Sequence, residues 1–153
     1  MKLHCLHTKQ HLPITLSEAW NFLTEPGNLK VITPDYMGFE IVSGADRAMY
    51  PGQIIEYLVT PLLGVKTTWV TEITHVQEGK YFVDEQRFGP YSLWHHKHFI
   101  TETEDGVIME DIVHYKLPFG IIGRLLEPFL VKPKLKEIFE YRKNKLETLF
   151  GKT

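Results

Sequence analysis

The chain has 153 residues, of which 43% are hydrophobic and 24% charged, and its formal net charge is −2. These values are typical of one globular domain, here residues 1–153. The charge balance gives no electrostatic reason to expect nucleic acid as a partner. The single cysteine, Cys5, excludes an intrachain disulfide. No window reaches the roughly 18 apolar residues of a membrane span, and the N-terminus lacks the apolar run of a signal peptide, so we expect a cytoplasmic protein.

Two short helices are predicted to follow the first strand. Met1–Leu12 alternates loosely between polar and apolar residues, which indicates a strand. Ser17 is a suitable N-cap for the first helix. The Pro26-Gly27-Asn28 sequence ends this helix, and a second short one is predicted over Leu29–Ile32. The apolar face of the first helix carries Leu16, Trp20 and Leu23.

The middle of the chain shows the period-two pattern of strands. Its Glu104-Asp105-Gly106 sequence is typical of a tight hairpin turn. The connections are too short for parallel crossovers, so the predicted sheet is antiparallel. The predicted strands are Phe39–Val42, Gln53–Leu63, Val65–Val76, Tyr81–Phe88, Tyr91–Thr103 and Val107–Lys116.

The pattern changes period after Ile121. Apolar residues then recur at spacings of three and four, which predicts an amphipathic helix that is most regular over Pro133–Phe150. Pro128 and Pro133 lack an amide donor, so we expect a kink or a restart near them. The stripe expected to pack on the sheet consists of Ile122, Leu126, Phe129, Val131, Leu135, Ile138, Phe139, Leu146 and Leu149.

The order of these elements predicts an α+β architecture. A curved antiparallel sheet of about seven strands would wrap around the long C-terminal helix, with two short helices after the first strand. One helix cannot fill the whole concave face of such a sheet. We therefore expect a cavity between sheet and helix, which is a natural site for a small apolar ligand.

Several motifs resemble a known family. The most specific residues are Asp84-Glu85-Gln86, Gly89-Pro90-Tyr91, Trp94, His96 and His98. Further matching residues are Trp20, Phe22, Ile32-Thr33-Pro34, Phe39-Glu40-Ile41, Trp69, Asp111, Tyr115, Leu117-Pro118-Phe119-Gly120, Ile138-Phe139 and Arg142. Over nearly its whole length the chain resembles the START-like superfamily, also called SRPBCC, and within it the short bacterial stand-alone branch related to CoxG-type proteins. This resemblance implies a helix-grip fold and a hydrophobic ligand, and it implies no particular reaction.

The strongest candidate for chemistry is the stretch from Trp94 to His98. Strand geometry places Trp94, His96 and His98 on one face and His95 on the other. We favour a hydrogen-bond network of inward polar groups; ligand recognition or acid–base chemistry comes second, and a metal site third. We assign no metal and no cofactor. The further ligands that a metal would need are sought among Asp84, Asp111 and Glu110.

Two carboxylates are predicted to face the interior. Asp84 shares a strand face with Gln86, and Asp111 shares one with Tyr115. A buried carboxylate is costly unless it is paired. We therefore expect each to contact a partner drawn from His96, His98 and Arg87.

Three functions remain open, and the first is favoured. In the favoured hypothesis, the protein is a non-catalytic binding or carrier protein for a lipid-like, isoprenoid, aromatic or polyketide-like molecule. Alternatively, it is an enzyme of the cyclase or aromatase type that uses His96, His98, Asp84 or Asp111, or an accessory protein that docks to a membrane or a partner enzyme through Phe119–Lys136. The predicted ligand-binding residues are Trp69, Phe82, Asp84, Gln86, Tyr91, Trp94, His96, His98, Asp111, Tyr115, Phe119 and Phe139.

Overall fold

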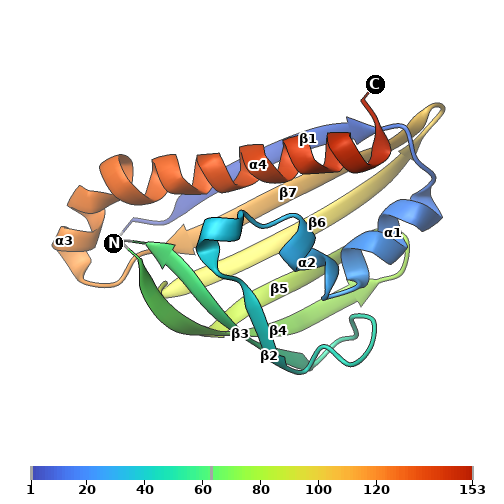
Figure 1. The fold of residues 1–153 in the computed structure, drawn as a ribbon. Helices are drawn as coiled ribbons and strands as arrows, with labels where there is room; N and C mark the ends of the chain where they lie inside the picture. Colours follow the sequence, from blue (N-terminus) through green and yellow to red (C-terminus); the bar gives the residue numbers. More distant parts are fainter. Residues whose placement is uncertain (1, 63, 153) are drawn as a thin grey trace.

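A computed structural model describes residues 2–62 and 64–152. Seven strands form one antiparallel sheet in the order β1-β7-β6-β5-β4-β3-β2, and the long helix α4 (Lys132–Phe150) lies along its concave side (Figure 1). The strands are β1 (His4–Leu12), β2 (Glu40–Ser43), β3 (Gln53–Leu62), β4 (Val65–Gln77), β5 (Tyr81–Phe88), β6 (Leu93–Thr103) and β7 (Gly106–Lys116). The shorter helices are α1 (Leu16–Thr24), α2 (Asn28–Val31), the 3₁₀ turn η1 (Asp35–Met37), α3 (Gly120–Leu126) and the π-helical turn η2 (Glu127–Val131).

The predicted α+β architecture is confirmed, including the two short helices after the first strand. The N-cap of α1 was predicted wrongly. Thr15, not Ser17, precedes the helix in an extended conformation, and its hydroxyl accepts a hydrogen bond from the Glu18 amide while the Glu18 carboxylate accepts one from the Thr15 amide. This reciprocal pair requires the T-x-x-E spacing that begins at Thr15. The predicted strand ends Met1 and Leu63 lie outside the described residues.

The register of the central strands brings polar residues together on the concave face. In the β5–β6 pair Asp84 lies opposite His96, and in the β6–β7 pair His98 lies opposite Asp111. Directly opposite residues of antiparallel strands have their Cβ atoms about 5 Å apart on the same face of the sheet. Two cross-strand pairs on three neighbouring strands therefore form one cluster.

The hydrophobic core consists of three clusters around the concave face. One joins α1 to β6 and β7 and includes Leu23 and Phe82. A second joins the beginning of α4 to β7 and includes Leu135. The third lies on β3 and β4 and includes Tyr57 and Ile73. Residues of all three clusters line the same cavity, so the cavity lies where the clusters meet.

The predicted apolar stripe of the C-terminal segment is wrong at its beginning. Val131, Leu135 and Leu146 are buried, as expected for a helix packed on a sheet. The three stripe residues before Val131 are not covered: Ile122 is 64% exposed, Leu126 45% and Phe129 79%. At the other end of the stripe, Leu149 is also exposed. The helix does restart near the two prolines, as predicted, through the π-helical turn η2. Because a π turn changes the angle between successive residues, it moves the stripe of α3 away from the sheet.

Among the helices of the described chain, none is both long enough and apolar enough to cross a membrane.

Candidate functional site

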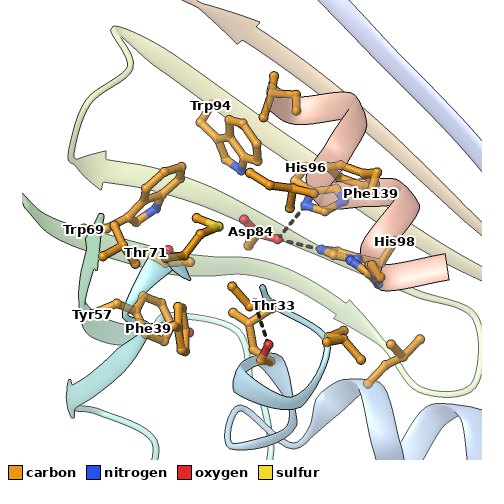
Figure 2. Close-up of a pocket in the computed structure, with 18 of the residues that line it drawn as sticks. Thr33, Phe39, Tyr57, Trp69, Thr71, Asp84, Trp94, His96, His98 and Phe139 are labelled. Atoms are coloured by element: carbon orange, nitrogen blue, oxygen red, sulfur yellow. Dashed lines mark hydrogen bonds and ion pairs between the residues drawn. The ribbon is translucent and has the colours of Figure 1, made fainter. Parts of the chain in front are cut away.

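The concave face encloses a cavity of about 180 Å³ between the sheet and α4. Its walls come from α1, α2, η1, strands β3 to β6 and α4, and most of them are apolar (Figure 2). Trp69, Trp94 and Phe139 give the cavity an aromatic wall, and Tyr57 on β3 extends it next to Trp69, its register partner on β4. Such an apolar cavity with few polar groups is typical of small-molecule sites. The polar side chains in the lining are Asn28, Thr33, Thr71, Asp84, His96, His98, Lys134 and Arg142.

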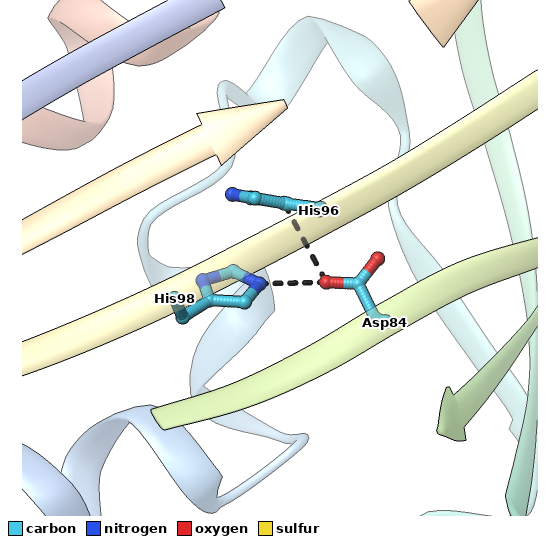
Figure 3. A group of neighbouring side chains, drawn as sticks. All are labelled: Asp84, His96 and His98. Atoms are coloured by element: carbon cyan, nitrogen blue, oxygen red, sulfur yellow. Dashed lines mark hydrogen bonds and ion pairs between the residues drawn. The ribbon is translucent and has the colours of Figure 1, made fainter. Parts of the chain in front are cut away.

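Asp84, His96 and His98 form a contiguous polar group within this lining (Figure 3). His98 Nε2 lies 2.6 Å from Asp84 Oδ2, and His96 Nδ1 lies 3.5 Å from the same oxygen. The two imidazole ring centres are only 3.6 Å apart. One carboxylate oxygen therefore faces one nitrogen from each imidazole.

Asp111 and Arg142 lie on the far side of these imidazoles. Asp111 Oδ1 is 2.9 Å from His96 Nε2, 2.9 Å from His98 Nδ1 and 3.4 Å from a terminal nitrogen of Arg142. Both imidazoles therefore extend from Asp84 on one side to Asp111 on the other. The Arg142 guanidinium places a positive charge next to Asp111, which offsets part of the cost of burying that carboxylate.

The surroundings keep both carboxyl groups ionised. Burial alone would raise the pKa of Asp111, but the Arg142 guanidinium and the two imidazoles hold it well below its ordinary value. Burial also opposes ionisation of Asp84, and the imidazoles of His96 and His98 bring the pKa of that carboxyl below its ordinary value. Opposite charges and hydrogen bonds to the charged form explain both directions.

The pKa values of the two histidines are shifted in opposite directions. Burial lowers the pKa of His96, and the neighbouring His98 lowers it further. Burial has the same effect on His98, but its contacts with Asp111 and Asp84 outweigh it and raise the pKa of His98. A neutral His96 that donates from Nε2 to Asp111 has an unprotonated Nδ1, so we assign that tautomer from its contacts. His96 Nδ1 and the Asp84 carboxylate are then two acceptors side by side in an apolar cavity.

Two buried nitrogens in this cluster lack a hydrogen-bond partner among the described residues: His98 Nδ1 and Arg142 Nε. His98 Nδ1 is close enough to Asp111 for an ion pair, but the approach is out of line for a hydrogen bond. Arg142 is 8% exposed and lines the cavity. A buried donor without a partner is costly, which favours a ligand or a solvent molecule with an acceptor oxygen at this position.

Eight of the residues predicted to bind ligand line the cavity: Trp69, Phe82, Asp84, Tyr91, Trp94, His96, His98 and Phe139. The other four lie outside the lining for separate reasons. Gln86 hydrogen-bonds to the backbone of Tyr91, and Asp111 lies behind the histidines. Tyr115 is buried and donates from its hydroxyl to Glu127, while Phe119 is exposed at the beginning of α3.

Two further expectations are corrected by the structure. Arg87 does not pair with either inward carboxylate, because it forms ion pairs with Glu72 and Glu85. Glu110 pairs with His7 and Lys9 and is not near the histidine pair. Both residues follow the alternation of their strands: Arg87 and Glu110 are one residue out of phase with Gln86 and Asp111.

Arg142 is the principal site residue to which sequence reasoning gave no role. The signal was present, because Leu135, Phe139, Arg142 and Leu146 follow one another at helical spacings of four, three and four. A charged residue within an apolar stripe needs a buried partner. Asp111 was the matching carboxylate, but its distance from the helix could not be known without the fold.

No protein-family model matches the chain, and no curated protein matches it. Several solved structures do match the chain. Protein CV1439 from Chromobacterium violaceum superposes with a TM-score of 0.71 at 13% identity, covering 98% of this chain and 99% of that one. Ara h 8.0201 gives 0.60 at 15% identity, covering 96% and 99%. Norcoclaurine synthase from Thalictrum, a point mutant bound to a transition-state analogue, gives 0.64 at 12% identity, covering 97% and 96%.

The chain has the helix-grip fold. Its seven-stranded sheet and long C-terminal helix match the Bet v 1-like neighbours, which is consistent with the START-like architecture that the motifs resemble. At these identities the likeness shows the fold alone. Membership of the CoxG-related branch remains a prediction.

Proposed function

We propose that this helix-grip protein binds a hydrophobic small molecule that carries one polar end. The observation that supports this most directly is the placement of one charged cluster, Asp84, His96, His98 and Arg142, in the wall of a largely apolar cavity. Removing apolar ligand surface from water supplies about 25 cal/mol per Å² of affinity before the losses of binding. The polar cluster would then select the orientation of the ligand.

The cavity favours a compact ligand with an aromatic or unsaturated body. Its volume of about 180 Å³ is below the range of roughly 300–1,000 Å³ common for drug-sized ligands. Trp69 and Trp94 meet edge to face with ring centres 5.2 Å apart, so a flat ligand would meet both a ring face and a ring edge. A hydroxyl on that ligand would donate to Asp84, and Arg142 Nε offers a separate donor to an acceptor oxygen in the cavity. A fold neighbour, norcoclaurine synthase, was solved with a transition-state analogue, which supports small-molecule binding by this fold.

Tryptophan fluorescence tests the proposal directly. Trp69 and Trp94 line the cavity, whereas Trp20 packs against Phe82 outside the lining. We expect a saturable change in emission on titration with hydroxylated aromatic and isoprenoid compounds, and co-purification of an apolar molecule in native mass spectrometry.

Thr71→Phe is designed to fill the cavity, because Thr71 is buried and lines it. This variant should abolish the fluorescence response. Thr68→Phe is the matched control, since Thr68 lies on the other face of the same strand and outside the lining. No response across the panel, or an equal response in Thr71→Phe, would contradict the proposal.

Acid–base catalysis on the bound molecule is a second candidate, and the divergent shifts of the two histidines favour it. His96 is held neutral with Nδ1 free to accept, while His98 is held as a donor. Titratable neighbours driven apart in this way are typical of acid and base pairs. The test is turnover: His96→Asn should remove it while leaving binding of the ligand within a few-fold. Binding without turnover in the wild-type protein would leave the carrier function as the better description.

We also propose that the segment Phe119–Leu130 docks on an anionic membrane surface. Seven of its large apolar side chains are exposed: Phe119, Ile121, Ile122, Leu125, Leu126, Phe129 and Leu130. Between Leu117 and Lys136 the sequence has four basic residues and one acidic residue, Glu127, which is buried. Exposed apolar side chains next to basic residues favour an anionic lipid interface.

Sedimentation with vesicles measures this docking. Phe129→Asp should reduce binding to vesicles containing anionic lipid about tenfold or more, whereas Val42→Asp, an exposed apolar position on β2, should leave it unchanged. Equal binding of both variants would contradict membrane docking. Capture of a protein partner without vesicle binding would assign the segment to that partner.

A further inference from the structure

We propose that Asp84, His96 and His98 form a binding site for a divalent transition-metal ion of the zinc class. His96 Nδ1, His98 Nε2 and a carboxylate oxygen of Asp84 all lie within 4.8 Å of one another, and they belong to two adjacent strands that hold them at the cavity wall (Figure 3). Two imidazole nitrogens and one carboxylate oxygen are a ligand set that suits zinc and ferrous ions. The sequence alone ranked a metal last among the interpretations of the His-x-His pair.

Both distances from Asp84 Oδ2 to the candidate imidazole nitrogens are within 1 Å of the spacing in a metal site. With bonds of about 2.0–2.1 Å, two ligands of a tetrahedral zinc ion are about 3.3 Å apart. His96 Nδ1 and Asp84 Oδ2 are 3.5 Å apart, which matches this spacing. His98 Nε2 and Asp84 Oδ2 are 2.6 Å apart, so a metal would need these two groups to separate by less than 1 Å. A metal ion bound here would take the place of the proton that His98 Nε2 and Asp84 Oδ2 share.

The contacts behind the imidazoles are the strongest support. A metal-binding imidazole nearly always directs its second nitrogen to a carboxylate or a carbonyl, which fixes its tautomer and orientation. Here His96 Nε2 hydrogen-bonds to Asp111 Oδ1 at 2.9 Å, whereas His98 Nδ1 lies 2.9 Å from the same oxygen as an ion pair that is out of line for a hydrogen bond. Arg142 in turn holds Asp111, with 3.4 Å between the charged atoms. One anchored carboxylate therefore fixes the His96 imidazole by a hydrogen bond and attracts that of His98 by charge, and the other nitrogen of each imidazole faces Asp84.

The site leaves coordination positions open toward the cavity. The described residues supply three ligands, and a tetrahedral ion needs a fourth. Arg142 Nε, a buried donor without a partner among the described residues, belongs to the same cavity lining and would hydrogen-bond an acceptor oxygen of a molecule held there. Three protein ligands with an open position are typical of metal sites that bind or activate a small molecule, whereas structural zinc sites have four protein ligands.

The experiment measures metal binding with no organic ligand present, so its outcome is independent of the proposed carrier function. Protein without a histidine tag is stripped with a chelator and titrated with Zn²⁺ by calorimetry and with Co²⁺ by visible absorption. We expect one equivalent of Zn²⁺ to bind and to displace Co²⁺. His96→Asn, His98→Asn and Asp84→Asn should each weaken Zn²⁺ binding at least about 100-fold. Asp111→Asn, which changes only the positioning residue, should weaken it about 10- to 100-fold.

His95→Asn is the matched control, because His95 directly precedes His96, lies on the opposite face of β6 and pairs with Glu85. It should bind Zn²⁺ as the wild type does. Zn²⁺ binding that is absent from the wild type, or that His96→Asn and His98→Asn leave unchanged, overturns the proposal and assigns any uptake to surface histidines. X-ray absorption of the zinc-loaded wild type needs no variant: two imidazoles on the ion support the site, and one or none overturns it.

Discussion

The ammonium group of Lys134 lies 3.8 Å from the centre of the Tyr36 ring, and this contact joins α4 to η1 at the edge of the cavity. Lys134 lines the cavity and also pairs with Glu137 at 3.1 Å. Thr33 and Met37, which flank Tyr36 in the sequence, also line the cavity. A cation over an aromatic ring contributes about 0.5–1 kcal/mol at exposed sites. A contact of this strength favours a closed cavity edge, yet it is weak enough to break so that the edge can open.

Loss of this contact should accelerate ligand exchange. We expect Lys134→Ala and Tyr36→Ala each to raise the dissociation rate of a bound ligand about two- to fivefold, measured by stopped-flow tryptophan fluorescence. The double variant should be no faster than the faster single variant, because both remove the same interaction. Lys136→Ala, an exposed lysine on the same helix and outside the lining, serves as the control. Additive effects of the two variants on the dissociation rate would show that Lys134 and Tyr36 do not act through one shared contact.

The Asp111–Arg142 pair should dominate the stability of the site. Both side chains are buried, so Arg142→Met leaves the Asp111 carboxylate with the histidines alone and should cost about 3–5 kcal/mol of unfolding free energy. Asp111→Asn combined with Arg142→Met should cost less than the sum of the two changes, since no unpaired charge remains. Urea unfolding followed by circular dichroism measures both. Additivity within about 0.5 kcal/mol would show that the pair does not interact.

The stability of the metal-free protein should pass through a maximum near pH 6.5. The pKa of His96 is lowered from 6.5, so its contribution is complete above that pH and is lost as the pH falls toward the folded value. The pKa of His98 is raised from 6.5, so its contribution is complete below that pH and is lost as the pH rises through the folded value. The pKa values of Asp84 and Asp111 are lowered, so a further loss occurs in acid, below their ordinary value of 3.8.

Urea unfolding at a series of pH values in the presence of a chelator tests this maximum. His96→Asn should flatten the acid side between pH 6.5 and the carboxylate range, and His98→Asn should flatten the alkaline side. His95→Asn, on the outer face of the sheet, is the control for a histidine outside the buried cluster. An alkaline side that His98→Asn leaves unchanged would show that His98 is not the charged member of the pair.

Sequence alternation predicted the inward face of β6 correctly, because successive side chains of a strand must point to opposite faces. It could not predict which inward residues meet. The pairing of Asp84 with His96 depends on the register of β5 against β6, and the alignment of Asp84 with β4 depends on a register shift in the β4–β5 pair between Ile73 and His75. Such an irregularity adds one residue to one strand and leaves no clear sequence signal. The distance from Arg142 to Asp111 likewise depends on where α4 crosses the sheet.

The prediction that the apolar stripe around α3 packs on the sheet was wrong for a different reason. Helical periodicity identifies an apolar face but not what covers it. Leu126 and Leu135 are nine residues apart and were expected on one stripe, yet the π-helical turn between them leaves Leu126 45% exposed and Leu135 5% exposed. The two prolines indicated an interruption correctly, but a proline does not specify the rotation that follows it.

Phe119 is the single non-glycine residue with positive φ in the described chain, at 65°, and its side chain is 80% exposed. A bulky residue in the left-handed region is strained by about 1–3 kcal/mol, and an exposed ring returns little packing energy. Phe119→Gly relieves this strain, although glycine gives up about 0.5–1 kcal/mol through backbone entropy. We therefore expect the free energy of unfolding to stay constant or to rise by up to about 1 kcal/mol.

Membrane docking predicts the opposite effect of the same change on binding. Phe119→Gly should weaken sedimentation with anionic vesicles several-fold, because an exposed ring next to Ile121 and Ile122 is lost. Phe119→Ala separates the two effects, since it removes the ring but keeps a side chain in the strained conformation. It should weaken vesicle binding equally and give no gain in stability. A Phe119→Gly protein that is less stable, or that binds vesicles as well as the wild type, would show that the strain at Phe119 does not hold a membrane-facing side chain in place.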